Sequence, residues 1–204
     1  WESVEDWAFT RPPDGELKDW RVLYIQRQWR RPMTPPHPSQ DKPDQEKRRT
    51  RREERLREHL DAFEEEEPGE LERAQPRAVA LHAAVQDART SGDMEAVRPD
   101  LTDTAAAVLE TELWRYTSVG LRRRRTRVMV AEVEPSRLIF DGGGHLLILR
   151  LQGTLFDVVT DLDGAVKGEQ ALDPYRFSEY VALYRQKGGS WRLHQIDADG
   201  QFTL

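Results

Sequence analysis

The sequence predicts an α+β fold in which helices pack on one face of a curved antiparallel sheet. Apolar residues recur with a helical period between residues 76 and 120, and with a strand-like period after residue 127. Glycine-containing turns separate the strand-like segments, as is typical of an antiparallel meander. The apolar residues are concentrated after Pro76, so the hydrophobic core is expected within residues 76–204.

Residues 1–30 are expected to form an N-terminal β-hairpin segment. Residues 3–9 and 20–25 carry aromatic and β-branched side chains, and the Pro-Pro-Asp-Gly sequence at 12–15 is typical of a turn. The tryptophan-containing pattern of 20–25 also repeats at 191–196. The hairpin is therefore interpreted as the remnant of a second domain copy, as a hairpin that completes a neighbouring sheet, or as an unrelated hairpin.

Residues 31–75 are expected to form a Pro-rich linker followed by a charged helix. Five prolines between 31 and 43 fix φ and favour an extended, semi-rigid chain. In the helix, Leu56, Leu60 and Phe63 recur at i, i+4 and i+7 and form a thin apolar stripe. We interpret this stripe as a partner-docking surface; the alternative is a charged helix that faces solvent.

Residues 76–204 form the predicted main domain. Pro76 suits the first turn of a helix that ends at Gly92, and Asp103 is expected to cap a longer helix that ends at Gly120. The expected strands are 127–134, 137–140, 145–159, 175–185 and 190–196.

Five arginines follow the longer predicted helix: Arg122, Arg123, Arg124, Arg125 and Arg127. One hypothesis is that they bind phosphate groups of RNA or of anionic lipids, where each cation contributes about 1 kcal/mol. The alternative is that they stabilise the C-terminal end of the helix through its dipole.

The composition argues against several classes of protein. Charged residues make up 33% of the chain and hydrophobic residues 37%, so part of the chain is expected to lie outside a compact core. The formal net charge is −6, which argues against a basic nucleic-acid-binding domain. No apolar run approaches the roughly 18 residues needed to cross a bilayer, and the chain has no cysteine.

Three residues are candidates for acid–base chemistry in an internal pocket: Tyr116, Asp157 and His194. Their spacing does not enforce a shared site, so we expect no enzymatic activity. The five histidines are scattered without ligand-type spacing, and neither a metal nor a cofactor is expected.

The order of motifs after residue 76 resembles that of a known family. Ser-Gly-Asp-Met-Glu at 91–95 lies in the helical part, and Val-Met-Val-Ala-Glu-Val at 128–133 lies in the strand-rich part. The strand at 177–185 is followed by Trp-Arg-Leu-His-Gln-Ile at 191–196. This pattern is similar to that of the Tim44-like family, which is named after a mitochondrial import-motor adaptor and includes proteins of the large mitochondrial ribosomal subunit. The resemblance implies a cone-like fold of the kind found in nuclear transport factor two.

The resemblance also implies a function. It indicates a non-catalytic structural subunit of the large mitochondrial ribosomal subunit, in the matrix and peripheral to the inner membrane. The implied partners are mitoribosomal proteins and ribosomal RNA within a large hetero-assembly. The alternatives are an accessory subunit of an inner-membrane import or respiratory complex, and an enzyme or small-ligand binder that uses the cone pocket. The acidic net charge departs from the basic composition of ribosomal members and favours a peripheral position.

Overall fold

The computed structural model describes residues 2–10, 21–30, 42–141, 143–167 and 174–197. The chain divides into two compact units, Trp1–Arg49 and Thr50–Leu204. In the first unit, β1 (Glu2–Thr10) and β2 (Arg21–Arg30) pair in antiparallel fashion. The predicted hairpin strands are therefore confirmed, whereas the predicted turn at 12–15 and most of the Pro-rich linker lie outside the described residues.

The second unit consists of helices and one antiparallel sheet. Its helices are the C-terminal part of α1 (Lys42–Glu66), α2 (Glu70–Ser91), the short η2 (Arg98–Asp100) and α3 (Asp103–Thr117). Its strands are β3 (Leu121–Asp141), β4 (Gly144–Asp161), β5 (Val166–Lys167), β6 (Tyr175–Gln186) and β7 (Arg192–Asp197). No helix in the described part of the chain combines the length and the apolar character needed to span a membrane.

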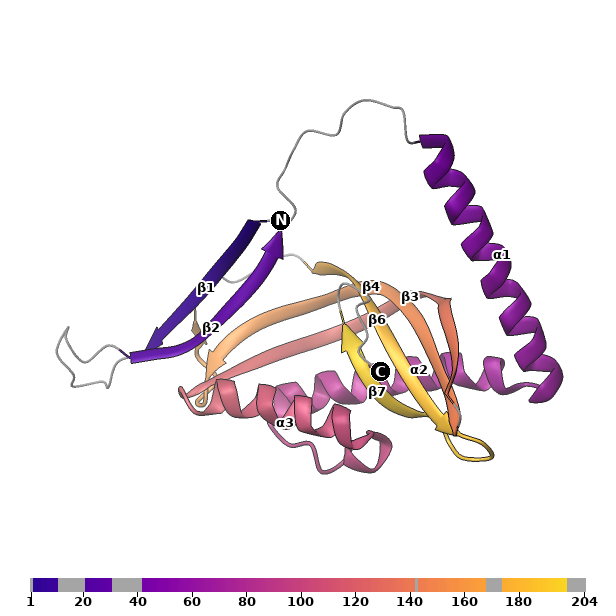
Figure 1. Ribbon diagram of the computed structural model, residues 1–204. Helices are drawn as coiled ribbons and strands as arrows, with labels where there is room; N and C mark the ends of the chain where they lie inside the picture. The colour runs from indigo at the N-terminus through magenta and orange to yellow at the C-terminus, as the bar shows by residue number, and fades with distance from the viewer. Residues whose placement is uncertain (1, 11–20, 31–41, 142, 168–173, 198–204) are drawn as a thin grey trace. The chain divides into compact units, whose positions relative to one another are not determined.

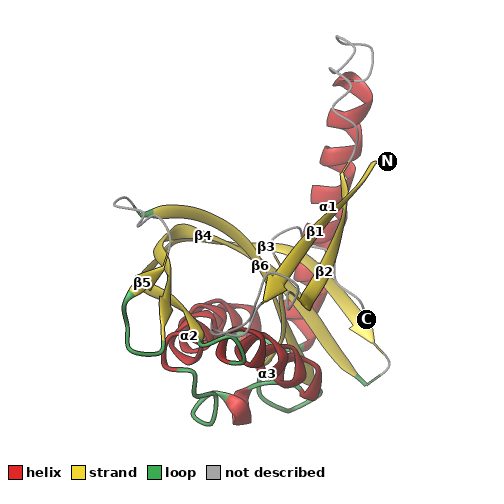
Figure 2. Cartoon of the chain, turned by 90° about the vertical axis from the view of Figure 1, so that its left-hand side faces the viewer, coloured by secondary structure: helices red, strands yellow, loops and turns green. Residues whose placement is uncertain are grey.

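The sheet has the order β3-β4-β6-β7, with β5 paired to β4. The long strands β3 and β4 arch over α2 and α3 (Figure 1), and a view from the side shows the two helices beneath the concave face (Figure 2). The predicted α+β fold, with helices on one face of a curved antiparallel sheet, is confirmed.

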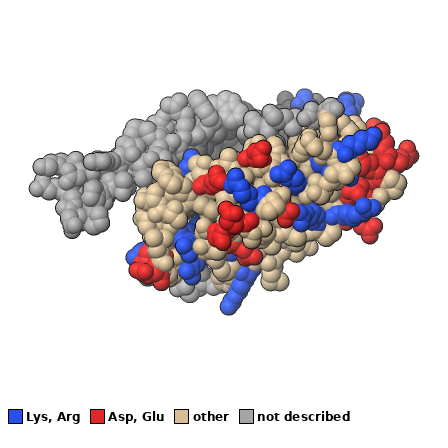
Figure 3. Space-filling model, turned by 90° about the horizontal axis from the view of Figure 1, so that it is seen from below, with Lys and Arg blue, Asp and Glu red and all other residues tan. Residues whose placement is uncertain are grey.

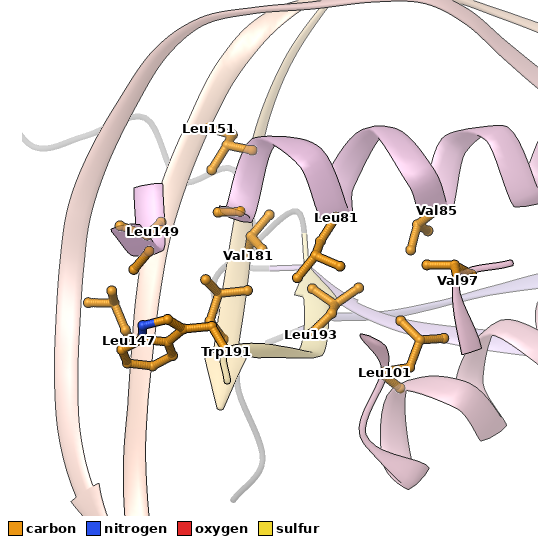
Figure 4. Close-up of a cluster of buried hydrophobic side chains, with 14 of the residues drawn as sticks. Leu81, Val85, Val97, Leu101, Leu147, Leu149, Leu151, Val181, Trp191 and Leu193 are labelled. Carbon is orange, nitrogen blue, oxygen red and sulfur yellow. The ribbon is translucent and has the colours of Figure 1, made fainter. Parts of the chain in front are cut away.

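The hydrophobic core lies between the helices and the concave face of the sheet. Leu81 and Val85 project from α2 towards the sheet, where Leu149 and Leu193 are among the buried partners (Figure 4). These side chains recur at helical spacing on α2 and at alternate positions on the strands, so each element buries one face. Burial of each large aliphatic side chain contributes about 2 kcal/mol to the free energy of unfolding.

The backbones of β3 and β4 come into close contact at Gly153 of β4. A Cβ atom at this position would collide with the backbone oxygen of Met129, and β3 shows irregular register between Thr126 and Met129. Only glycine lets the two backbones approach in this way, so the register irregularity of β3 and Gly153 together fit the curvature of the sheet.

Helix boundaries differ from those predicted at three places, one of which is the end of α3 at Thr117 rather than Gly120. The helix α2 begins at Glu70 rather than Pro76, because Gly69 adopts a left-handed conformation (φ 77°) that turns the chain out of α1. The residue that caps α3 is Thr102 rather than Asp103, since the Thr102 side chain accepts a hydrogen bond from the Ala105 N–H at 3.3 Å.

The arginine cluster lies in a strand rather than in the helix before it, and Arg122 packs beside Gly92, the residue that ends α2, and lines a small cavity with Tyr116 and Thr117 of the last turn of α3. The strand β3 begins at Leu121 and contains all five arginines. Two sets of hydrogen bonds keep this segment extended. One edge of β3 pairs with β4, and its other edge hydrogen-bonds to α2. The backbone N–H of Arg125 donates to the Thr90 hydroxyl and the Arg125 carbonyl accepts from it, both at 3.1 Å.

A buried cluster, the corner network, joins the α1–α2 corner to the sheet. It consists of Phe63, Glu67, Glu70, Arg185 and Trp191. The Arg185 guanidinium pairs with both glutamates, and its carbon lies 5.9 Å from the Phe63 ring centroid and 5.0 Å from that of Trp191. The indole N–H of Trp191 donates to Glu70 at 3.1 Å. The last turns of α1 are therefore part of the core of the second unit.

Candidate functional site

Five ionisable side chains on the concave side of the sheet form a connected group, the concave ion network. Its members are His82 of α2, Arg123 and Arg125 of β3, Asp157 of β4 and Glu179 of β6. Arg125 is the register partner of Asp157, and Arg123 lies two residues away on the same face of the sheet. The strand register therefore brings these charges together.

The distances within the concave ion network are those of charge-assisted hydrogen bonds. The Nε of Arg123 donates to Oδ1 of Asp157 at 2.9 Å, and the Nε of Arg125 donates to Oδ2 at 3.1 Å. The Nη1 of Arg125 also donates to Oε1 of Glu179 at 3.1 Å. The second oxygen of Glu179 lies 2.8 Å from Nε2 of His82, which is fully buried and stacked on Phe177.

The two carboxylates of this network are held ionised. Burial alone would raise the pKa of Asp157, but hydrogen bonds and charges from Arg123 and Arg125 outweigh it and lower that pKa. Burial would likewise raise the pKa of Glu179, and the hydrogen bond with His82 and the charge of Arg125 outweigh it and lower that pKa. A general base works best with a pKa near the operating pH, so both carboxylates are weak proton acceptors at neutral pH.

The five predicted phosphate-binding arginines have different surroundings. Arg123 and Arg125 use their guanidinium groups within the concave ion network. Arg122 packs beside Gly92 and Arg124 lies near Gly164, both half-buried. Arg127 is exposed, has a left-handed backbone (φ 51°) and lies over the Phe156 ring at 5.4 Å.

The face of the described residues in Figure 3 shows acidic and basic side chains interspersed. Ion pairs also join oppositely charged helical residues, such as Arg89 with Glu112 at 2.8 Å and Arg98 with Glu110. Such a surface produces little long-range field of one sign.

The three catalytic candidates lie in separate surroundings. Tyr116 of α3 lies half-buried beside Arg122 and Arg123, around a cavity of only about 10 Å³. Asp157 belongs to the concave ion network, and His194 lies on β7 with its Nδ1 3.3 Å from the Thr102 hydroxyl. The described residues contain no group of three or more histidine, aspartate or glutamate side chains placed to hold a metal ion.

The apolar stripe of α1 packs against its own chain over part of its length. Phe63 is fully buried in the corner network, and Leu60 packs against the same core. Leu56 is half-buried and lines a groove against the end of β3. Only the Leu56 end of the stripe is placed to contact another molecule.

An open groove of about 340 Å³ lies between α3 and β7 and is called the α3–β7 groove. Its apolar lining comprises Val85, Leu101, Ala105, Val108, Leu109, Leu193 and Ile196. Val108 is 59% exposed, and the Arg89–Glu112 ion pair and His194 supply polar groups to the lining. Since β7 is the last strand in the sheet order, this apolar groove lies beside a sheet edge.

Sequence reasoning missed the groove and two members of the concave ion network. Glu179 could have been found, because it shares one face of β6 with Phe177, Val181 and Leu183, where a charge must have a buried partner. The partner of that charge, His82, is on a helix 97 residues away, and no local pattern joins the two.

A known protein family matches most of this chain in sequence. The family model described as the Tim44-like domain matches residues 75–198. One similar solved structure is the intermembrane space region of the chloroplast protein ARC6, at 16% sequence identity and a TM-score of 0.41, covering 61% of this chain and 96% of that one. A search of curated proteins gives no match. On the strength of the family match, which covers more than half of its residues, this chain belongs to the Tim44-like domain family.

Proposed function

We propose that the chain is a non-catalytic docking subunit at the periphery of the mitochondrial inner membrane, and that it belongs to the large subunit of the mitochondrial ribosome. The α3–β7 groove is the observation that carries this proposal. It places the exposed Val108 beside buried apolar side chains next to a sheet edge, which suits an apolar segment of a partner protein. Membership of the Tim44-like family supports a role in protein interaction at a membrane.

The concave ion network supports docking over catalysis. In the cone fold an enzyme places its acid or base on this concave face, whereas here Asp157 and Glu179 are neutralised by internal cations. Tim44-like domains are in general non-catalytic, in agreement with this arrangement.

An accessory subunit of an inner-membrane import or respiratory complex is the second candidate. Two of the five predicted phosphate-binding arginines are committed to the concave ion network, and the net charge is −6. Both observations favour attachment to protein over attachment to RNA. In the ribosomal assignment, contact with phosphate falls to the exposed Arg127 and to the half-buried Arg122 and Arg124.

Sedimentation of the tagged chain from gently lysed mitochondria, with and without ribonuclease, tests the assignment. Co-migration with the large ribosomal subunit that is lost after RNA digestion supports the ribosomal assignment. Migration in a ribonuclease-resistant membrane complex supports the second candidate, and a small free species contradicts docking altogether.

Val108→Arg tests the groove itself. The substitution places a guanidinium group where an apolar segment of the partner would lie, so the affinity of the chain for its partner complex should fall by about tenfold or more. Val166→Arg on β5, where the valine is 41% exposed, is the matched control and should attach like the wild type. Unchanged attachment of Val108→Arg would exclude the α3–β7 groove as the docking surface.

A further inference from the structure

A second groove, the α1–β3 groove, has a different chemical character. It has a volume of about 400 Å³ and lies between α1 and the C-terminal part of β3. Arg52, Arg55 and His59 line it from α1, and Arg137 lines it from β3. The three α1 residues recur at i, i+3 and i+7, so they project from the same face of the helix.

The cations of this groove differ from those of the concave ion network. Arg123 and Arg125 are neutralised by carboxylates, but Arg52, Arg55 and Arg137 make no ion pair within the described part of the chain. None of the described residues that line the groove is acidic. Three arginines therefore line one groove with no carboxylate among its described lining residues.

Apolar side chains also line the groove. Leu56 and Ile139 line it, and Phe140 remains 49% exposed. The Phe140 ring is held edge-on by two imidazoles, with ring centroids 6.3 Å from His59 and 5.2 Å from His145. An exposed aromatic ring held in this way is a pre-ordered apolar contact, and its use costs little side-chain entropy.

We propose that the α1–β3 groove binds an acidic amphipathic segment of a partner protein. Apolar side chains of that segment contact Phe140 and Leu56, and its carboxylates pair with the guanidinium groups of Arg52, Arg55 and Arg137. Arginine favours carboxylates because its planar fork can donate two parallel hydrogen bonds. A groove lined by both arginines and apolar side chains accommodates a narrow segment, whereas a bilayer presents a broad surface.

Fluorescence anisotropy of the full chain with a labelled peptide tests the proposal. The probe is a peptide of about 16 residues, or about four helical turns, with leucines at i, i+3, i+4 and i+7 and glutamates beside them. The full chain should bind it, binding should weaken with added salt, and a probe with glutamine in place of glutamate should bind about tenfold more weakly.

Arg55→Glu and Arg57→Glu form a matched pair on the same helix. Arg55 lines the groove and Arg57 does not, although both substitutions change the charge equally. Arg55→Glu and Arg137→Glu should each weaken binding by about tenfold, while Arg57→Glu should leave it nearly unchanged. Phe140→Ser should also weaken binding, and Val108→Arg should not, which separates this groove from the α3–β7 groove.

Three results would overturn the proposal. The first is absence of binding to the acidic probe. The second is equal weakening by Arg55→Glu and Arg57→Glu, which would indicate a diffuse charge effect. The third is Arg55-dependent binding to vesicles of phosphatidylglycerol and phosphatidylcholine without binding to the peptide, which would assign the groove to an anionic lipid surface.

Discussion

At the scale of single residues, the most informative position is Asp157. Its carboxylate lies between Arg123 and Arg125, two cations of the predicted phosphate-binding cluster. Taking charges out of water is unfavourable, so each member of such a group depends on the others for its stability. Removal of the Asp157 carboxylate leaves Arg123 without its counter-charge and Arg125 with Glu179 as its remaining partner in the network.

We expect Asp157→Asn to lower the free energy of unfolding by about 2 kcal/mol at neutral pH, as for hydrogen bonds to charged groups. The folded-state pKa of Asp157 is lowered, so its contribution is fully present above the ordinary carboxyl pKa of about 4 and is lost as the pH falls through the folded-state value. The difference between wild type and variant should therefore shrink below about pH 4. Urea denaturation at several pH values measures this difference.

Asp87→Asn is the control for this experiment. Asp87 is exposed on α2, so its substitution should change stability by less than about 0.5 kcal/mol. A stability difference for Asp157→Asn that stays constant down to pH 2.5 or so would contradict the assignment of this carboxylate as a lowered-pKa group.

At the scale of elements, the C-terminal turns of α1 decide how much of the apolar stripe is internal. Phe63 contacts His145 and Trp191 edge-on, with ring centroids 5.0 and 6.2 Å away. Leu56, two turns earlier, remains half-buried in the α1–β3 groove. One helix thus uses its apolar stripe both for its own core and for an open groove.

Phe63→Ala should destabilise the chain by about 3–5 kcal/mol, because it opens a cavity in a packed core. Leu56→Ala should cost less than about 1 kcal/mol and should instead weaken binding in the α1–β3 groove. Thermal unfolding followed by circular dichroism compares the two variants. If both variants unfold at the wild-type temperature, the stripe serves a partner along its whole length.

At the scale of the whole molecule, the compact unit Thr50–Leu204 is larger than the family match at residues 75–198. The additional residues include Phe63, Glu67 and Glu70, which supply three of the five members of the corner network. Arg185 and Trp191, inside the matched region, are buried by these contacts.

A fragment of residues 50–204 should therefore unfold in a single cooperative transition at a higher temperature than a fragment of residues 75–204. The shorter fragment leaves the Arg185 charge without its two glutamates and exposes the site of Phe63, at a cost of about 3 kcal/mol or more. Differential scanning calorimetry of both fragments measures the difference. Equal transition temperatures would mean that the family-matched region is a complete folding unit.

The sequence by itself determined the fold class and most of the elements, although the strands expected at 127–134 and 137–140 are the single strand β3. The 3.6-residue period of Leu81 and Val85 placed a helix, and the alternation of Phe177, Val181 and Leu183 placed a strand, because each element must bury one face. The glycine-containing turns and the tryptophan-containing closing pattern at 191–196 added the antiparallel layout and the family.

Only the tertiary structure decided what the charged residues do. Arg123 and Asp157 are 34 residues apart, Arg125 and Glu179 are 54 apart, and Arg185 and Glu67 are 118 apart. An arginine has the same local pattern whether it faces a phosphate, a carboxylate or water, so its partner depends on strand register and helix packing. Local periodicity fixes which face of an element is buried, and contacts between distant segments fix which charges are neutralised and which remain available to a partner.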